Sequence, residues 1–226
     1  MLNKKEQASP LKKLDFKKDS KELYNPSVQP SLVTVPAMRF LMVDGRGNPN
    51  EAGGDYQRAV ELLYAVSYTI KMSKQGAFQP AGYVDFTVAP LEGLWWLDDD
   101  TTLDFSQKEK YCWTSMIRQP DFVTQEVFEW ARAARKKGPD TAGLRLQSYD
   151  EGLCVQAMHI GAYDSEPETI RKMEEFMAHN ALASDLGSPS SDGMPRRHHE
   201  LYLGDPRKLA PHKRRTILRL PVKRVR

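Results

Sequence analysis

Cysteine is scarce in this chain, with only Cys112 and Cys154 among 226 residues. Two cysteines exclude a disulfide framework and a multi-cysteine zinc site. Long apolar runs are also missing, and the mean hydropathy is −0.61. A transmembrane helix needs about 20 apolar residues, so no membrane association is expected. The first residues lack the apolar stretch of a signal peptide, which favours a reduced, cytoplasmic protein.

A strong excess of charge of one sign is absent as well. Lysine and arginine number 33 against 30 acidic residues, which gives a net charge of +3. Basic residues gather at 4–21 and at 213–226. No nucleic-acid-binding signature accompanies either cluster, so we interpret them as a solvated tail and a charged strand edge, and nucleic acid is not an expected partner. The polar, proline-containing residues 1–30 predict a flexible or extended basic arm.

The common fingerprints of catalysis and cofactor binding are missing too. The chain has no Gly-x-Ser-x-Gly elbow, no Walker loop and no dinucleotide-binding glycine pattern. Its five histidines, including the neighbours His198 and His199, do not follow a metal-ligand spacing. We therefore expect neither a metal nor a cofactor.

Apolar periodicity divides the chain into two similar halves. The first half has strand patterns at 32–43, 83–88 and 111–118, with a helical period at 56–72. The second has strand patterns at 144–149, 153–161, 198–203 and 216–222, with a helix after the capping pattern Ser165-x-x-Glu168. A helical stripe at 124–137 connects the halves, and residues 91–107 are interpreted as mostly an insert. Gly45 and Gly161 mark equivalent positions, which indicates a duplication.

The duplication predicts an α+β fold in which two strand-helix-strand-strand units form one pseudo-symmetric antiparallel sheet, with the helices on one side. The domain is expected at 31–226, with repeat one at about 31–120, a connector helix at about 121–140 and repeat two at about 141–226. Pockets favour the interface between such units. We therefore expect a ligand cleft at the seam between the repeats.

Two residues in the strand at 198–203 are candidates for the floor of this cleft. Side chains alternate along a strand, so Glu200 and Tyr202 share the face opposite to Leu201. A carboxylate and a phenol on one face suit the polar floor of a cleft. The same pattern also fits the solvent-facing side of an antiparallel sheet.

Aromatic residues concentrate in the first half, where all four tryptophans lie between residues 95 and 130. Flat aromatic surfaces suit planar apolar ligands and cations, although a core also needs large side chains. Neighbours on an extended chain point to opposite faces, so one residue of the Trp95–Trp96 pair is expected at a pocket or an interface. Methionine adapts to varied ligands, with core filling as the alternative. The predicted substrate-binding residues are Tyr68, Trp95, Trp96, Trp113 and Met116.

Five segments together resemble the GyrI-like (gyrase-inhibitor-like) small-molecule-binding family over roughly residues 20–226. They are PSLVTVP at 30–36, MVDGRGNPN at 42–50, PLEGLWW at 90–96, WTSMIRQPDFV at 113–123 and HHELYLGDPR at 198–207. The resemblance implies a tandem of strand-helix-strand-strand units whose seam binds planar, often cationic xenobiotics between aromatic walls and a buried glutamate. Glu200 matches the position of that glutamate. No helix-turn-helix module precedes the matched region, so the resemblance is to the stand-alone branch of the family.

The resemblance leaves several functions open. In the first, the cleft binds and sequesters planar hydrophobic or cationic small molecules. In the second, the protein is an enzyme of the stand-alone branch that hydrolyses the cyclopropane of DNA-alkylating compounds. Glu200 would then activate water, and Tyr202 or another hydroxyl would bind the carbonyl oxygen that gains charge. The alternative is a non-catalytic interaction protein that modulates a macromolecule such as DNA gyrase. We expect a monomer or a weak dimer.

Overall fold

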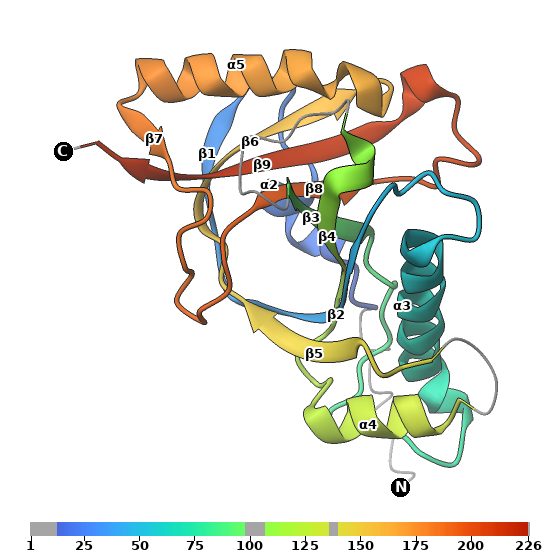
Figure 1. The fold of residues 1–226 in the computed structure, drawn as a ribbon. Helices are drawn as coiled ribbons and strands as arrows, with labels where there is room; N and C mark the ends of the chain where they lie inside the picture. The colour runs from blue at the N-terminus through green and yellow to red at the C-terminus, as the bar shows by residue number, and fades with distance from the viewer. Residues whose placement is uncertain (1–12, 98–106, 136–139, 226) are drawn as a thin grey trace, which may run out of the picture.

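The computed structural model describes residues 13–97, 107–135 and 140–225. Its strands form one nine-stranded sheet in the order β1-β6-β9-β8-β3-β4-β2-β5, with β7 beside β9 (Figure 1). Every strand pair is antiparallel. The strands are β1 (Ser31–Val35), β2 (Met38–Arg46), β3 (Leu91–Leu97), β4 (Tyr111–Arg118), β5 (Leu144–Tyr149), β6 (Gly152–Ile160), β7 (Leu182–Ser184), β8 (His198–Tyr202) and β9 (Arg215–Arg224).

Five α-helices accompany the sheet within these described residues. They are α1 (Phe16–Asp19), α2 (Lys21–Tyr24), α3 (Asp55–Met72), α4 (Gln125–Ala133) and α5 (Glu166–His179). Short 3-10 turns lie at η1 (Ser73–Gln75), η2 (Lys108–Lys110), η3 (Tyr163–Ser165) and η4 (Pro211–Lys213). In the part of the chain that the structure describes, no helix has the length and apolar character needed to cross a membrane.

The strand order has a two-fold pattern about the junction of β3 with β8. On one side β3 pairs with β4 and β4 with β2, and on the other side β8 pairs with β9 and β9 with β6. Helix α3 follows β2 as α5 follows β6, so each half is a strand-helix-strand-strand unit, as predicted. The strand before each unit crosses to the other half, because β1 pairs with β6 and β5 pairs with β2. This exchange ties the two halves into one sheet.

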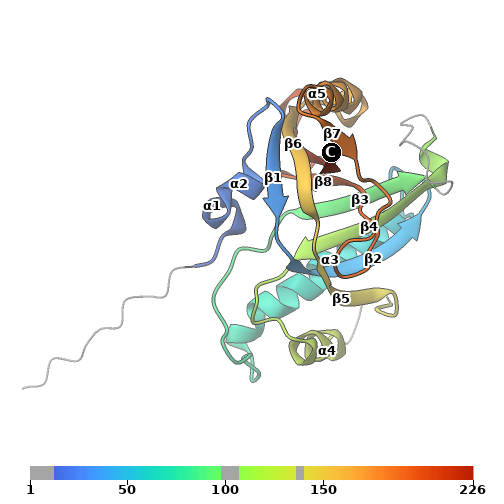
Figure 2. The ribbon, with the colours of Figure 1, turned by 90° about the vertical axis from the view of Figure 1, so that its left-hand side faces the viewer.

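The two long helices cover the same face of the sheet, as predicted. Glu200 is the direct cross-strand partner of Gly93 on β3 and of Leu218 on β9, so these positions point to one face. Leu218 belongs to the apolar cluster beneath α5. Trp95, on the same face as Gly93, lies against Tyr56 of α3 with ring centroids 5.4 Å apart. Helices α3 and α5 therefore cover different halves of this face, on either side of the seam (Figure 2).

The strand that follows the helix in the first half is β3, and not the predicted segment 83–88. Within the described residues, 83–88 makes one isolated bridge, between Phe86 and Leu14. Its alternation arises because Phe86 is buried while its neighbours are partly exposed. β3 lies in the segment that was interpreted as an insert. Both faces of this strand are buried, so its sequence lacks the alternation of polar and apolar residues that marks a half-exposed strand. Glu92 and Trp95 are both buried although they point to opposite sides, so no polar side marks the strand.

The flexible or extended arm predicted at 1–30 does not describe the helical segment within it. Residues 1–12 lie outside the described part of the chain, whereas α1 and α2 pack against the body of the protein. They bury Phe16, Leu23 and Tyr24, and the guanidinium of Arg118 lies over the Phe16 ring, 4.1 Å from its centroid. The flexible or extended arm is therefore wrong for this segment, because a few apolar anchors within a lysine-rich sequence hold it in place.

The N-terminus of α5 lacks the predicted capping box. Ser165 ends the turn η3, and its hydroxyl donates to the carbonyl of Ala162 at 2.7 Å instead of accepting a hydrogen bond from the helix. Glu166, the first residue of α5, is 1% exposed. The η3 turn thus delivers a buried carboxyl group to the helix-covered face of the sheet.

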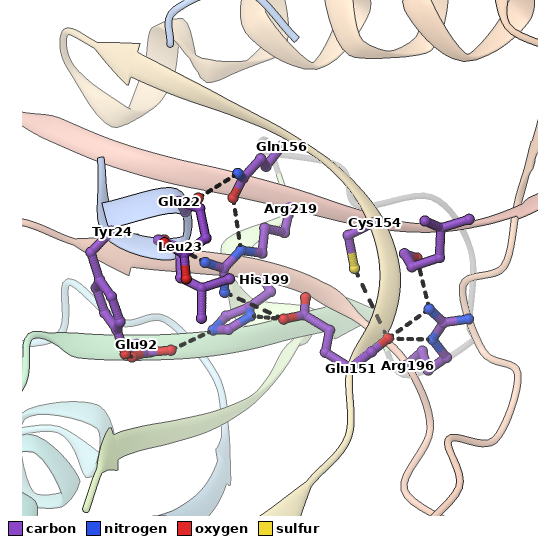
Figure 3. A network of polar contacts seen from close by, with 11 residues as sticks. Glu22, Leu23, Tyr24, Glu92, Glu151, Cys154, Gln156, Arg196, His199 and Arg219 are labelled. Atoms are coloured by element: carbon purple, nitrogen blue, oxygen red, sulfur yellow. Dashed lines mark hydrogen bonds and ion pairs between the residues drawn. The ribbon is translucent and has the colours of Figure 1, made fainter. Parts of the chain in front are cut away.

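A buried polar network lies on the opposite face of the sheet (Figure 3). Nε2 of His199 on β8 is 3.0 Å from Oε2 of Glu92 on β3, and its Nδ1 is 3.0 Å from Oε2 of Glu151. The same Glu151 oxygen lies 3.4 Å from the guanidinium of Arg219 on β9. The Tyr24 hydroxyl donates to Glu92 at 2.9 Å. These contacts join α2, β3, β8, β9 and the turn between β5 and β6.

The network holds charged groups away from water. Burial disfavours the imidazolium of His199, but the carboxylates of Glu151 and Glu92 outweigh it and raise its pKa to about 9. Burial also disfavours ionised Glu151, yet His199 and Arg219 outweigh it and lower its pKa to about 2. At neutral pH the network therefore contains a histidinium ion held between carboxylates.

His199 makes the stability of the protein depend on pH. Its pKa rises from 6.5 to about 9 on folding, so the stabilisation is complete below pH 6.5 and is lost as the pH rises through 9. We expect the free energy of unfolding, measured by denaturant titration, to fall by on the order of 3 kcal/mol over this range. His212→Gln, at an exposed position, should keep the wild-type profile. A flat wild-type profile between pH 6.5 and 9 would contradict the charged state.

Candidate functional site

A cleft of about 1200 Å³ opens between α3 and α5, above the junction of β3 with β8. This is the predicted position, at the seam of the two units. The cleft is lined by one tryptophan, Trp95, and by six of the nine tyrosines: Tyr56, Tyr64, Tyr68, Tyr111, Tyr163 and Tyr202. The walls are thus aromatic but carry hydroxyl groups, which suits a flat ligand with polar atoms.

Helix α3 supplies one wall of the cleft. Tyr56, Val60, Tyr64 and Tyr68 follow one another at intervals of four residues and all line it. Side chains at this spacing lie on one face of a helix. The core is built by a neighbouring stripe that includes Leu63, Val66 and Ile70. Tyr68 is 51% exposed and therefore lies at the rim of the cleft.

Strands β3 and β8 supply the floor. The Tyr202 hydroxyl donates to Oε2 of Glu200 at 2.7 Å and accepts from Nε1 of Trp95 at 2.9 Å. Nε2 of His198 lies 3.2 Å from Oε1 of Glu200. Glu200 is 7% exposed and faces the cleft, so a carboxylate with both oxygens oriented by neighbouring groups lies at its base.

Gly93 makes this arrangement possible. It is the cross-strand partner of Glu200. A β-carbon at Gly93 would lie 2.7 Å from Nε1 of Trp95 and 3.4 Å from the Tyr202 hydroxyl. The missing side chain therefore leaves the space in which the indole and the phenol meet.

A second carboxyl group borders the first. Glu166 reaches the cleft from α5 and lies within hydrogen-bonding reach of Glu200 and Thr216. Burial, together with the neighbouring carboxylate of Glu200, raises the pKa of Glu166 well above its ordinary value. Burial and the neighbouring Glu200 thus both favour the protonated form of Glu166.

The tyrosines around this pair keep their protons. Burial and the negative charge of Glu200 raise the pKa of Tyr202 and of Tyr56 well above the ordinary value. Burial and the acidic groups nearby also raise the pKa of Tyr163 to about 12, against the opposing effect of Arg214. These phenols are hydrogen-bond donors at neutral pH and do not act as bases.

Three of the predicted substrate-binding residues lie away from the cleft. Trp96 lies on the opposite face, beside a smaller hollow of about 700 Å³, with the Arg197 guanidinium 4.9 Å from its ring centroid. Met116 is fully buried on that same opposite face, as the cross-strand partner of Glu92. Trp113 points toward α3 but is 1% exposed and packs directly on Gly45, behind Tyr56. Met116 and Trp113 are buried because they pack in the core. Trp96 lies on the opposite face because side chains alternate along β3.

Four of the residues named from the sequence, Glu200, Tyr202, Trp95 and Tyr68, line this cleft. Tyr56 and Tyr64 were not predicted as site residues, although their four-residue spacing with Tyr68 is typical of one face of a helix. Glu166 was not predicted either, because it lies within the capping pattern Ser165-x-x-Glu168, which indicates the start of a helix and not a binding site. In the part of the chain that the structure describes, no group of three or more His, Cys, Asp or Glu residues is arranged to hold a metal ion.

Comparisons with known proteins agree on one family. The sequence pattern of the GyrI-like small molecule binding domain matches residues 28–223. Two Listeria innocua proteins of known structure are similar to this chain, each comparison covering 93% of this chain and 100% of the other. One is a hydrolase with 48% identity and a TM-score of 0.81, and the other is an uncharacterized conserved protein with 49% identity and a TM-score of 0.84.

A more distant similarity concerns the fold alone. The C-terminal domain of EcmrR is 12% identical with a TM-score of 0.50, and the comparison covers 87% of this chain and 98% of that one. No functionally curated protein matches the chain.

Gly93→Ala tests the geometry of the floor. The added methyl group would press on the indole of Trp95, so we expect this substitution to break the Trp95–Tyr202 hydrogen bond and to destabilise the protein by about 1–3 kcal/mol. The shift of the Trp95 indole N–H resonance and a denaturant titration measure the two effects. Gly143→Ala is the matched control, because its β-carbon would meet nothing within 4 Å. An unmoved indole resonance in Gly93→Ala would contradict the close approach.

Proposed function

The chain belongs to the GyrI-like small molecule binding domain family, and from this premise we propose that its cleft binds a planar, largely apolar small molecule and that Glu200 activates water against it. The observation that carries the proposal is the buried Glu200 carboxylate, oriented by Tyr202 and His198 at the base of an aromatic cleft. A small-molecule hydrolase combines these two features.

Binding is favoured by the shape and chemistry of the walls. The Tyr56 and Trp95 rings are tilted by 35° with centroids 5.4 Å apart, and the Tyr163 ring meets the Tyr202 ring nearly edge-on. These rings offer faces and edges on which a flat ligand can stack. The phenol hydroxyls around them add hydrogen-bond donors without adding charge.

Hydrolysis is favoured by the environment of Glu200 and by the 48% identical relative that is a hydrolase. We propose a neutral carbon electrophile as substrate, namely a cyclopropane conjugated with a dienone, as in cyclopropane-bearing DNA-alkylating compounds. Glu200 takes a proton from water, the water oxygen bonds to a cyclopropane carbon, and the carbon–carbon bond breaks. Its electron pair moves into the ring system and appears as negative charge on the carbonyl oxygen.

Tyr202 supports Glu200 in this proposal. Its hydroxyl proton points to Glu200 Oε2, and its oxygen accepts from Trp95. We therefore assign Tyr202 to holding the carboxylate, and not to binding the substrate's carbonyl oxygen. The Tyr202 ring still lines the cleft and contributes to stacking.

A second candidate is binding without chemistry. Its specific support is the negative charge of the Glu200 carboxylate among aromatic rings, which suits a planar cation. The two candidates use the same residues, and turnover separates them.

Glu200→Gln keeps the size of the side chain and removes its charge and basicity. For a spirocyclopropyl dienone substrate we expect turnover, followed by mass detection of the hydrated product, to fall about 10²–10⁴-fold. Binding of a neutral planar dye should barely change. Glu61→Gln, which removes a carboxylate from the exposed rim of the cleft, should retain turnover. If the wild type shows no turnover but Glu200→Gln loses about 1–3 kcal/mol of affinity for planar cations, the protein is a binder.

Trp95 and Trp96 offer a matched pair of substitutions on adjacent residues. Trp95→Leu removes an aromatic wall of the cleft and should raise the Kd for a neutral planar dye about 2- to 10-fold, the scale of one aromatic contact. Trp96→Leu alters the opposite face and should leave the Kd unchanged. Fluorescence titration measures both. Equal effects of the two substitutions would place the dye outside this cleft.

A further inference from the structure

We propose that Glu166 is a second catalytic carboxyl group of the cleft, the acid that protonates the substrate oxygen on which negative charge develops while Glu200 delivers water. This inference rests on the proposed hydrolytic function and adds a residue to it. It also specifies the substrate class further, because a substrate must present a carbonyl-type oxygen that becomes basic as the bond breaks.

The first support is the position of Glu166. It lines the cleft, it is 1% exposed, and its carboxyl group lies within hydrogen-bonding reach of Glu200 and Thr216. Its Oε1 atom is buried and has no hydrogen-bond partner among the residues that the structure describes. A buried polar atom is normally satisfied by a partner. A carboxyl oxygen left without one beside a ligand cleft suits a ligand atom as its partner.

The second support is the division of charge between the two carboxyl groups. Two adjacent carboxylates resist ionising together, so one of them holds a proton. The hydrogen bonds favour the proton on Glu166, because the Tyr202 hydroxyl donates to Glu200 and His198 contacts its other oxygen. Two neighbouring carboxyl groups in different protonation states are the arrangement from which acid and base assignments follow.

The other groups that face Glu166 favour the same division. Asp164 in η3 adds negative charge and so opposes its ionisation, whereas the contact with Thr216 on β9 acts in the other direction. The phenols of Tyr163 and Tyr202 face the pair and remain protonated. Arg214, which also lines the cleft, has its guanidinium over the Tyr163 ring, 5.2 Å from the ring centroid. The effects that oppose ionisation of Glu166, namely burial and the acidic neighbours, thus outweigh the effects that favour it.

The step balances within the pair. Glu200 accepts one proton from the attacking water as the carbon–oxygen bond forms and the cyclopropane carbon–carbon bond breaks. Glu166 gives its proton to the substrate oxygen that receives the electron pair. The single product carries both a neutral alcohol and a neutral enol or phenol. Glu200 is then protonated and Glu166 ionised, and the transfer of one proton from Glu200 to Glu166 restores the starting state.

The protonation state can be tested without any substrate. Carbon-13 NMR of glutamate side chains, assigned through the backbone, should show Glu166 titrating well above an ordinary glutamate. In Glu200→Gln the Glu166 pKa should move down toward the ordinary range, because the neighbouring charge is removed. An ordinary Glu166 titration in the wild type would overturn the inference whatever the enzyme assays show.

The catalytic role is tested by the pH dependence of kcat/KM with a spirocyclopropyl dienone. The wild type should lose activity at high pH as Glu166 ionises. Glu166→Gln should lower turnover about 10²–10⁴-fold and remove that basic limb, which a merely structural defect would leave in place. Glu168→Gln, an exposed position in the same first turn of α5, should behave as the wild type. If Glu166→Gln does not fold, two wild-type measurements still test the role of Glu166: the basic limb of the pH profile and the NMR titration of Glu166.

The outcomes separate the two proposals. If Glu166→Gln retains the turnover and the basic limb of the wild type, the proposed role of Glu166 is wrong, whereas the proposed role of Glu200 stands. Turnover that is absent from the wild type overturns the proposed hydrolysis, and the catalytic role of Glu166 with it. Turnover that is lowered but measurable in both Gln variants, with the basic limb absent from Glu166→Gln, supports the acid–base pair.

Discussion

The antiparallel pairing of β3 with β8 is the contact on which the rest of the molecule depends. It joins the two halves of the sheet, and its two faces carry different chemistry. One face presents Glu200 and Tyr202 to the cleft, whereas the other presents Glu92 and His199 to a buried ion network. Side chains alternate along each strand, so a slip of one residue would exchange these sets and place the network's charges in the cleft. The cleft therefore depends on a register that the opposite face helps to hold.

The two faces treat buried charge in opposite ways. In the network, His199 lies between Glu92 and Glu151, and Arg219 lies beside Glu151, so each negative group has a positive neighbour. Such buried pairs contribute little net stability, but the loss of one partner is costly. We interpret these ion pairs as interactions that specify the pairing and register of the strands. In the cleft, Glu200 and Glu166 lie near each other and near a set of hydroxyl groups, and burial together with Glu200 raises the pKa of Glu166. Adjacent carboxyl groups with a raised pKa are typical of catalytic sites, whereas buried groups of balanced charge are typical of a structural role.

Much of the fold follows from local patterns. Helical periodicity predicts α3, the duplication predicts two strand-helix-strand-strand units, and the alternation in 198–203 places Glu200 and Tyr202 on one face. The failures have physical causes. β3 is buried on both sides and so shows no alternation, and α1 and α2 depend on three apolar anchors within a lysine-rich segment. The exchange of β1 and β5 between halves has no local signal, because it is a choice between partners far apart in the sequence.

For the site, the sequence by itself determined the residue types and the strand that carries them: a carboxylate and a phenol two residues apart, and aromatic residues in the first half. The tertiary structure decided which of those aromatic residues share the cleft. Trp95 lines it, whereas Trp96 faces the other side and Trp113 fills the space over Gly45. It also brought Glu166 beside Glu200 from a different element of the chain. Spacing along a chain fixes only neighbours within one helix or strand, and the pairing of two carboxyl groups from a helix and a strand arises only when the sheet and its covering helices pack together.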